Sequence, residues 1–552
     1  MRILLILIFS LAWQVHAQKL SFNGLGRVAV HLDRTAENHT DSLIKDNTMG
    51  GYSLVDLGLD FKPFSYFKGN AVVRLKNPFG MFWGDGVQLS IRQFRFEGIA
   101  NKVIRYQIGD IDLRMSNYTL FNPYPFPENL PEFMLLHKEI QEYENFVTKN
   151  SRRMQGITLF SVLESPDEIS QLRMRLMLAR NQPDLFSGET EQIFFGGNGR
   201  YVYRNVLNLT YNQTGFYSKN VSSQIPESRN RVSSLEFKIQ NQDSVNLPLK
   251  LEGEIGFSSN MLAREGKDSL RKSGKFLDVG IALNIKSLIC LKLGIISVNP
   301  RFFSVGAQTV RYPYSVWNNT SGLGTGENLF ALLWREDIYD RSLNFQLAAT
   351  DPRYNNIFPY GPATPNRQGL SFAINSGFRK NLDMAFKTFA GKEILGEGTP
   401  ELRHFYRAEG NVKVRLNNFP ANHRTTLFNF NIRTENTSRK AFRDTASVRL
   451  QNLFLGIGAD LETLRNLYIS GGILANISKG NEYQTLRDYG NTIVNFQHID
   501  INSREAIYSL GLIWKFANNS FFTVKWFNSF YSESGNREQR LRQFYFNYTA
   551  SF

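Results

Sequence analysis

The sequence predicts an all-β protein: a closed antiparallel transmembrane β-barrel of about 20–22 strands, with 18 as the lower alternative. Three observations lead to this fold class. Polar and apolar residues alternate along most of the chain, tight connections alternate with long ones, and the N-terminus has the features of an export signal. Two long inserted segments, 116–151 and 301–367, interrupt the predicted strands.

Residues 1–17 are predicted to be a secretory signal peptide. Arg2 supplies a basic start, and Ile3–Trp13 is an apolar run too short to span a bilayer. Val15-His16-Ala17 then places small residues at the cleavage positions. After this point no stretch reaches the roughly 20 apolar residues that a transmembrane helix needs. We therefore expect residues 18–552 to form one exported domain.

The composition also favours a barrel. The 552-residue chain has one cysteine, Cys290, which excludes the disulfide framework typical of loop-rich secreted proteins. It contains 45 Phe and 23 Tyr, yet its mean hydropathy is −0.31. A chain rich in aromatic residues but not hydrophobic overall fits a lipid-facing band with aromatic girdles around a polar interior.

Period-two alternation is the main pattern in the sequence. In residues 407–416 the polar face consists of Arg407, Glu409, Asn411, Lys413 and Arg415, and the other face of Ala408, Gly410, Val412, Val414 and Leu416. Comparable runs occur at 27–33, 67–76, 249–255 and 428–435. Successive side chains of a strand point to opposite faces, so these runs predict strands with one polar and one apolar face.

A soluble β-sandwich alternates too, but the lengths and connections favour a barrel. The runs are about 10–15 residues long, whereas strands of globular proteins usually have about 5–6. Tight turns are predicted near Ser65, Asn101, Ser287, Asn381, Pro420 and Asn519. Long connections are predicted at 35–50, 116–151, 183–198, 217–231, 260–275, 301–367 and 482–492. Short turns at one end and long loops at the other are typical of outer-membrane barrels.

The chain ends on an aromatic alternating strand. One face carries Phe544, Phe546, Tyr548, Ala550 and Phe552. This ending resembles the signal by which the barrel-assembly machinery recognises its clients for insertion. The whole exported chain resembles the porin-like outer-membrane proteins of Bacteroidota, and no plug-like domain precedes the first predicted strand. The resemblance implies a location in the outer membrane, in contact with its lipid, and argues against a TonB-dependent receptor.

The two inserted segments are the first candidates for function. Residues 130–149 have apolar residues at helical spacing and predict a short helix. This helix either folds into the lumen and narrows it or packs outside as a cap. The segment 301–367 is predicted to be a constriction or ligand-binding element with Arg353, Tyr360 and Arg367 exposed to solute, or else a rigid surface lid.

The predicted lumen carries both signs of charge. Its candidate basic residues are Arg173, Arg175, Arg407, Lys413 and Arg415. Opposite charges on neighbouring strands commonly pair, so these residues are either structural ladders or a basic path for anions. The net charge of +15 favours anionic partners. We predict no nucleic-acid partner, because no motif supports one.

No catalytic, metal-binding or cofactor-binding residues are predicted. No histidine lies at a metal-type spacing or within a nucleophile motif. The sequence therefore favours a porin-like channel or transporter for small hydrophilic solutes, with anions as the favoured class, over an enzyme. The alternative is a plugged barrel that serves as a structural or docking component of a surface or secretion assembly, with surface or periplasmic protein partners.

Overall fold

A computed structural model describes most of the chain after the predicted signal peptide. The described residues are 19–39, 42–79, 86–111, 113–121, 130–145, 154–166, 169–181, 190–204, 206–220, 227–240, 249–263, 270–285, 288–308, 350–378, 381–417, 425–442, 446–487, 493–517, 519–533 and 537–552. The predicted signal peptide and the predicted turns at Ser287 and Pro420 lie outside them.

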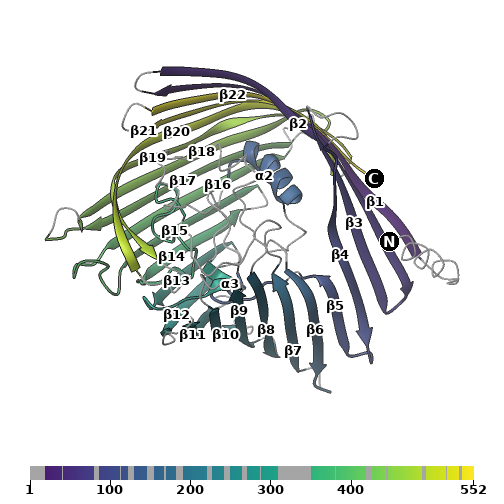
Figure 1. Cartoon of the computed structure of the whole chain (residues 1–552), viewed down its shortest axis with the longest axis vertical. Coiled ribbons are helices and arrows are strands. Elements are labelled where there is room, and N and C mark those ends of the chain that lie inside the picture. The colour runs from purple at the N-terminus through teal and green to yellow at the C-terminus, as the bar shows by residue number, and fades with distance from the viewer. Residues whose placement is uncertain are drawn as a thin grey trace.

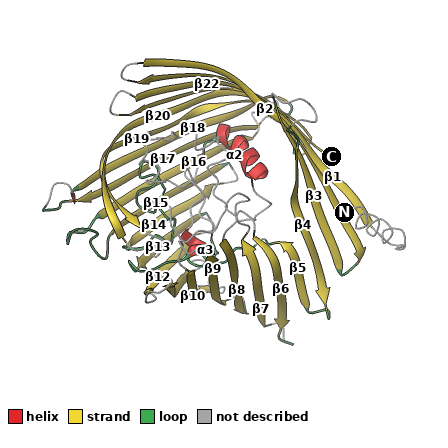
Figure 2. Cartoon of the chain, viewed as in Figure 1, coloured by secondary structure: helices red, strands yellow, loops and turns green. Residues whose placement is uncertain are grey.

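Nearly all of these residues belong to strands (Figure 2). The strands are β1 (Lys19–His39), β2 (Ser42–Phe64), β3 (Phe67–Pro78), β4 (Gln88–Ala100), β5 (Ile104–Asp110), β6 (Met154–Glu164), β7 (Ser170–Asn181), β8 (Thr190–Tyr203), β9 (Leu207–Asn220), β10 (Glu227–Gln240), β11 (Leu249–Ala263), β12 (Leu270–Ile285), β13 (Ile289–Val298), β14 (Arg367–Phe378), β15 (Leu382–Lys392), β16 (His404–Asn417), β17 (Thr425–Arg439), β18 (Val448–Leu464), β19 (Leu467–Arg487), β20 (Ile493–Ala517), β21 (Ser520–Glu533) and β22 (Arg537–Ser551). The helices are α2 (Glu132–Asn145) and the single turn α3 (Val305–Gln308).

The strands close into one antiparallel barrel (Figure 1). Each strand pairs with the next in sequence, and β1 pairs with β22 from Leu25 opposite Ser551 to Asn38 opposite Glu538. At the seam, Gly24 and Phe552 exchange two backbone hydrogen bonds of 2.8 and 3.0 Å. The described residues form 22 strands of this barrel, so the predicted range of about 20–22 is confirmed and the alternative of 18 is wrong.

The two faces of the wall differ as the alternation predicts. On β20, the outward Tyr508, Leu510, Leu512 and Trp514 are exposed, whereas the inward Ser509 is buried. On β22, Phe544 and Tyr548 point outward, and Tyr545 and Asn547 are buried inside. An apolar exterior around a polar interior fits lipid contact, and closure pairs the backbone groups that lipid could not satisfy. Separately, no described helix is long and apolar enough to cross a membrane.

Tight turns connect the strands at one end of the barrel. Asn101, Lys102, Asn466 and Asn519 have positive φ in these turns, a conformation that asparagine adopts more readily than most residues. The predicted long connections at 35–50, 183–198, 217–231, 260–275 and 482–492 are too long, because strands extend into each of these ranges. Residues 35–39 and 42–50 form the paired end of the β1–β2 hairpin, with Ala36 opposite Lys45. Their polar composition suggested a loop, but strand pairing uses the backbone and needs no apolar side chains beyond the membrane.

Candidate functional site

The helix α2 lies inside the ring of strands (Figure 1). Its first turn is anchored by apolar packing, because Phe133 and Met134 are buried with side chains from β18 to β21. Lys525 of β21 also donates a 2.5 Å hydrogen bond from Nζ to the carbonyl oxygen of Phe133. Of the two arrangements considered from the sequence, the structure has the helix within the lumen, and the helix spans Glu132–Asn145.

The C-terminal end of α2 rests on four cationic side chains of the wall. We call Arg27, Arg74, Lys76 and Arg92, from β1, β3 and β4, the basic patch. Arg27 Nη1 lies 2.7 Å from Glu144 Oε1, and Arg74 Nη1 donates a 2.5 Å hydrogen bond to the carbonyl oxygen of Glu144. Arg92 Nη2 donates to the carbonyl oxygen of Tyr143 at 2.7 Å. Cations stabilise a helix C-terminus, where backbone carbonyls lack partners.

Tyr143 and Asp56 complete this contact. The guanidinium of Arg92 lies 4.0 Å from the centre of the Tyr143 ring, and the Tyr143 hydroxyl donates to Asp56 Oδ2 at 2.6 Å. Asp56 also accepts two hydrogen bonds from Arg74, of 2.7 and 2.8 Å. Burial, with a further contribution from Asp56, raises the pKa of Tyr143 to about 12, so its hydroxyl remains a donor at neutral pH.

The second inserted segment folds against the wall from β17 to β21. Arg353 forms an ion pair with Asp351, with Nη2 2.5 Å from Oδ2, and donates from Nη1 to the Tyr531 hydroxyl at 2.8 Å. The Tyr354 hydroxyl donates to Glu505 at 2.8 Å. Although burial alone lowers the pKa of Arg353, the contact with Asp351 raises it well above its usual value. The guanidinium therefore stays charged inside the lumen.

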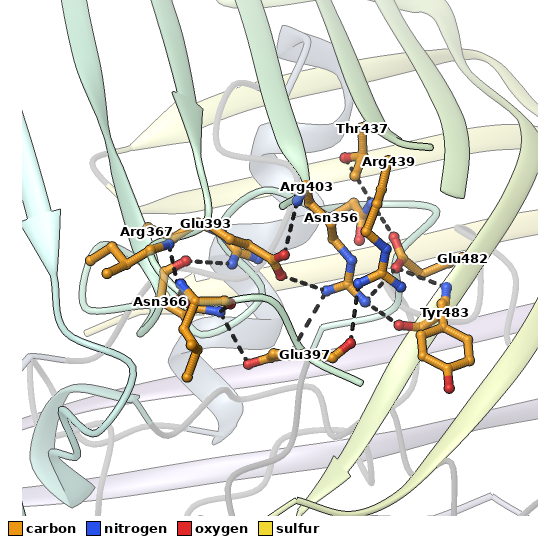
Figure 3. A network of polar contacts seen from close by, with 12 residues as sticks. Asn356, Asn366, Arg367, Glu393, Glu397, Arg403, Thr437, Arg439, Glu482 and Tyr483 are labelled. Carbon is orange, nitrogen blue, oxygen red and sulfur yellow. Dashed lines mark hydrogen bonds and ion pairs between the residues drawn. The ribbon is translucent and has the colours of Figure 1, made fainter. Parts of the chain in front are cut away.

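A neighbouring polar network holds the end of this segment (Figure 3). Arg403 lies among three carboxylates, with Nη1 3.2 Å from Glu393 Oε1 and Nη2 3.2 Å from Glu482 Oε1. Its Nη1 is also 3.9 Å from Glu397 Oε2. Arg367 donates to the carbonyl oxygen of Ile357 at 3.0 Å. A cavity of only about 60 Å³ lies beside this network, so the site has little room for a solute.

The predicted exposure of Arg353, Tyr360 and Arg367 is wrong. Their exposed fractions are 5%, 8% and 6%. The two arginines are held by carboxylate and carbonyl oxygens, and Tyr360 packs in an apolar cluster with Phe194, among others. Arginines in a turn-rich loop suggested solvent contact, but the loop lies against an acidic wall that the sequence did not locate.

A larger cavity of about 510 Å³ lies at the tight-turn end of the lumen. Residues from β2 to β7 line it, and Leu113 from the first inserted segment bounds it. We call it the basic cavity, because its charged lining residues are Lys62, Lys68, Arg105, Arg175 and Glu97. Lys68 is paired with Glu97 at 2.7 Å, and the guanidinium of Arg175 lies 5.4 Å from the centre of the Phe160 ring.

The wall from β10 to β12 carries the opposite charge. Glu236 lies opposite Glu254, which in turn lies opposite Asp278. Asn212 donates to Glu236 at 2.6 Å, and the Tyr118 hydroxyl donates to Asp278 at 3.1 Å. The acidic row is covered by Tyr118, whose ring stacks on Phe276 from β12. The acids of this part of the wall are thus covered, whereas the charged lining of the basic cavity is mainly positive.

The other predicted lumen residues are partly engaged in wall contacts. Arg407 is 2.7 Å from Glu409 and Arg415 is 2.8 Å from Asp383, as in a structural ladder. Lys413 lies opposite Asp383, and Arg173 donates to Gln171 at 2.5 Å. Among these candidates only Arg175 lines the basic cavity.

Sequence reasoning missed the basic patch, the acceptor Glu144 and the cavity residues Lys62 and Arg105. The polar faces of the predicted strands already contained Arg27, Arg74 and Lys76. The sequence does not show the curvature of the barrel, and this curvature brings β1, β3 and β4 to the helix.

Among the described residues, no group of three or more His, Cys, Asp or Glu side chains could hold a metal ion. His31 lies near a single carboxylate, with Nδ1 3.6 Å from Asp33 Oδ2. We find no Ser-His-acid arrangement in the described hydrogen bonds.

The fold and the lumen define this chain as a transmembrane β-barrel with segments packed inside it. No family model and no curated protein matches the sequence. The solved structures similar to it include three Pseudomonas aeruginosa proteins: OpdL, OccK2 (OpdF) in complex with glucuronate, and OprD. Their identities are 9%, 12% and 12%, and their TM-scores 0.36, 0.39 and 0.39. The alignments cover 96%, 79% and 79% of this chain and 99%, 97% and 94% of the others.

At such low similarity, the fold assignment rests on the strand pairing of this chain itself. None of the comparisons supports the specific resemblance to Bacteroidota proteins.

Proposed function

We propose that this barrel resides in the outer membrane as a porin-like channel for small hydrophilic solutes, with a preference for anions. The observation that carries the proposal is the basic cavity of about 510 Å³, where four cationic side chains accompany one carboxylate. Charge of one sign in a narrow, low-dielectric passage raises the local concentration of the opposite ion. Anions therefore collect at this end of the lumen.

The size of the barrel supports a passage. A barrel of 22 strands is too wide for wall side chains alone to fill, so water or inserted chain must occupy its interior. The described inserted residues pack against particular parts of the wall: α2 along β17–β19 and the patch, and residues 350–366 along β17–β21. They narrow the lumen and limit passage to small solutes. The proposal requires no catalytic step and no cofactor.

Solute entry into proteoliposomes tests the anion preference. Glucose and glucuronate are similar in size but differ in charge, so the ratio of their influx rates isolates the charge effect. Arg105→Glu reverses one charge in the basic cavity, and we expect it to lower the glucuronate-to-glucose ratio several-fold. Lys102→Glu makes the same change in the adjacent exposed turn and should leave the ratio unchanged. Equal ratios in wild type and Arg105→Glu would refute the anion preference.

A second function is favoured by the packing of the inserted segments. Phe133 comes from the first inserted segment, Phe303 and Tyr354 come from the second, and all three are fully buried within the barrel. This packing suits a plugged barrel that acts as a structural or docking component for surface or periplasmic proteins. Folded protein that admits neither glucose nor glucuronate would favour this function over the channel.

A further inference from the structure

The basic patch binds carboxylates from both the wall and the helix. Arg27, Arg74, Lys76 and Arg92 lie together, and they contact Asp56 of the wall and Glu144 of α2. Asp56 forms a two-pronged pair with Arg74. Glu144 is thus the carboxylate that α2 contributes to this contact.

Glu144 is bound as a free carboxylate ligand would be. Its Oε1 accepts from Arg27 Nη1 at 2.7 Å and also from the Tyr52 hydroxyl, and its Oε2 lies 3.7 Å from Lys76 Nζ. Both oxygens of the group thus face donors or a cation, and the side chain is 2% exposed. A guanidinium, a phenol and an ammonium converging on one carboxylate are typical of sites that recognise carboxylic acids.

The two ends of α2 are attached by different forces. The N-terminal turn is held by Phe133 and Met134 in an apolar cluster. The described contacts of the C-terminal turn with the patch are ionic, hydrogen-bonded or cation–π. An incoming carboxylate can replace the polar contacts of Glu144 with equivalent ones, whereas it offers no replacement for apolar packing. The C-terminal turn can therefore exchange with an anion while the N-terminal turn stays in place.

We propose that the basic patch is a binding site for organic carboxylates, and that the C-terminal end of α2 fills it with Glu144 in place of the ligand. A carboxylate solute displaces Glu144, takes up the donors of Arg27 and Tyr52, and frees the last turn of the helix. The identity of the natural ligand as a transported anion rests on the proposed channel function. The site itself rests only on the contacts of Glu144.

Chemical rescue tests the site in purified, detergent-solubilised barrel. Glu144→Ala removes the carboxylate together with the carbons that acetate would restore, so acetate should bind in the space and raise the unfolding temperature of the variant by several degrees. Chloride at the same ionic strength should not. Glu139→Ala removes an exposed carboxylate from the same helix and is the matched control, with no specific response to acetate expected.

Glu144→Gln covers the case in which the alanine variant does not fold. The amide keeps the size of the side chain and an acceptor for Arg27 and Tyr52, so this variant should unfold at a lower temperature than wild type and respond less to acetate than the alanine variant. An acetate response in Glu144→Ala no larger than in wild type or Glu139→Ala would overturn the proposal. If only Glu144→Gln folds, the proposal would be overturned by equal unfolding temperatures for this variant and the wild type.

The measurement needs no solute current. A barrel that conducts nothing can still show acetate rescue, which would separate failure of the channel function from failure of the site. Acetate rescue in a barrel that does not conduct would support the carboxylate site and indicate that the barrel is plugged.

Discussion

Arg353 and Tyr531 join the second inserted segment to the barrel wall through a hydrogen bond of 2.8 Å between Nη1 and the phenol oxygen. The two residues are 178 positions apart in the chain. The same guanidinium is paired with Asp351 and lies 3.9 Å from Glu505 on β20. One buried cation therefore balances acids from both the segment and the wall, and the position of residues 350–366 depends on it.

Replacing Arg353 should release this segment. In Arg353→Met, Asp351 and Glu505 remain buried without their cation, and loss of one partner of a buried ion pair typically costs about 3–5 kcal/mol. We expect the amides of Tyr354 and Asn355, which are hydrogen-bonded to Asp351, to exchange with deuterium much faster than in wild type. Arg301→Met changes an exposed arginine of the same inserted region and should leave their exchange unchanged. Unaltered protection in Arg353→Met would show that the ion pair does not hold the segment.

The barrel seam leaves no room for a side chain at Gly24. A methyl group there would lie 2.4 Å from Cζ of Phe552 and 2.7 Å from the carbonyl oxygen of Asp56, whereas one at Gly26 would meet nothing within 4 Å. Gly24→Ala should therefore displace the terminal phenylalanine and lower the unfolding temperature, and Gly26→Ala should not. For both variants, the unfolding temperature is measured as the temperature at which the folded band disappears on semi-native gels. Equal stability of the two variants would contradict the close fit of the seam.

His137 should make the barrel less stable in acid. Its ring lies between Phe527 and Tyr545, at centroid distances of 6.4 and 5.5 Å. Burial, followed by the positive charges of Lys525 and Arg27, holds the pKa of His137 well below its usual value. Because the unfolded chain binds the proton more readily, the stability from neutral His137 is complete above about pH 6.5 and falls below it by roughly 1.4 kcal/mol per pH unit.

The variant His137→Phe keeps an aromatic ring but cannot titrate. Unfolding temperatures at pH 8, 6.5 and 5 should decline more steeply for wild type than for the variant below pH 6.5, and in parallel above it. Parallel declines over the whole range would exclude a buried neutral imidazole.

The sequence predicted the barrel better than its lumen, for a physical reason. Strand faces are a local property, so the alternation at residues 407–416 correctly separated Arg407 and Glu409 from Ala408 and Gly410. Pairing across the lumen is not local. Nothing near Glu144 in the sequence indicates that Arg27 and Arg74 meet it, because that contact depends on the curvature of the closed wall. Asp351 lies beside Arg353 in the sequence, but the burial of Arg353 also depends on wall residues more than 100 positions away, Glu505 and Tyr531.

The proposed anion preference is tested most directly by the reversal potential of the purified protein in a planar bilayer with a KCl gradient. For the wild type we expect steady ohmic steps whose reversal potential has the sign of chloride permeation. In Arg105→Glu the reversal potential should shift towards the value for potassium permeation, and in Lys102→Glu it should not shift. Selectivity for potassium in the wild type, or electrical silence from a folded barrel, would contradict the account.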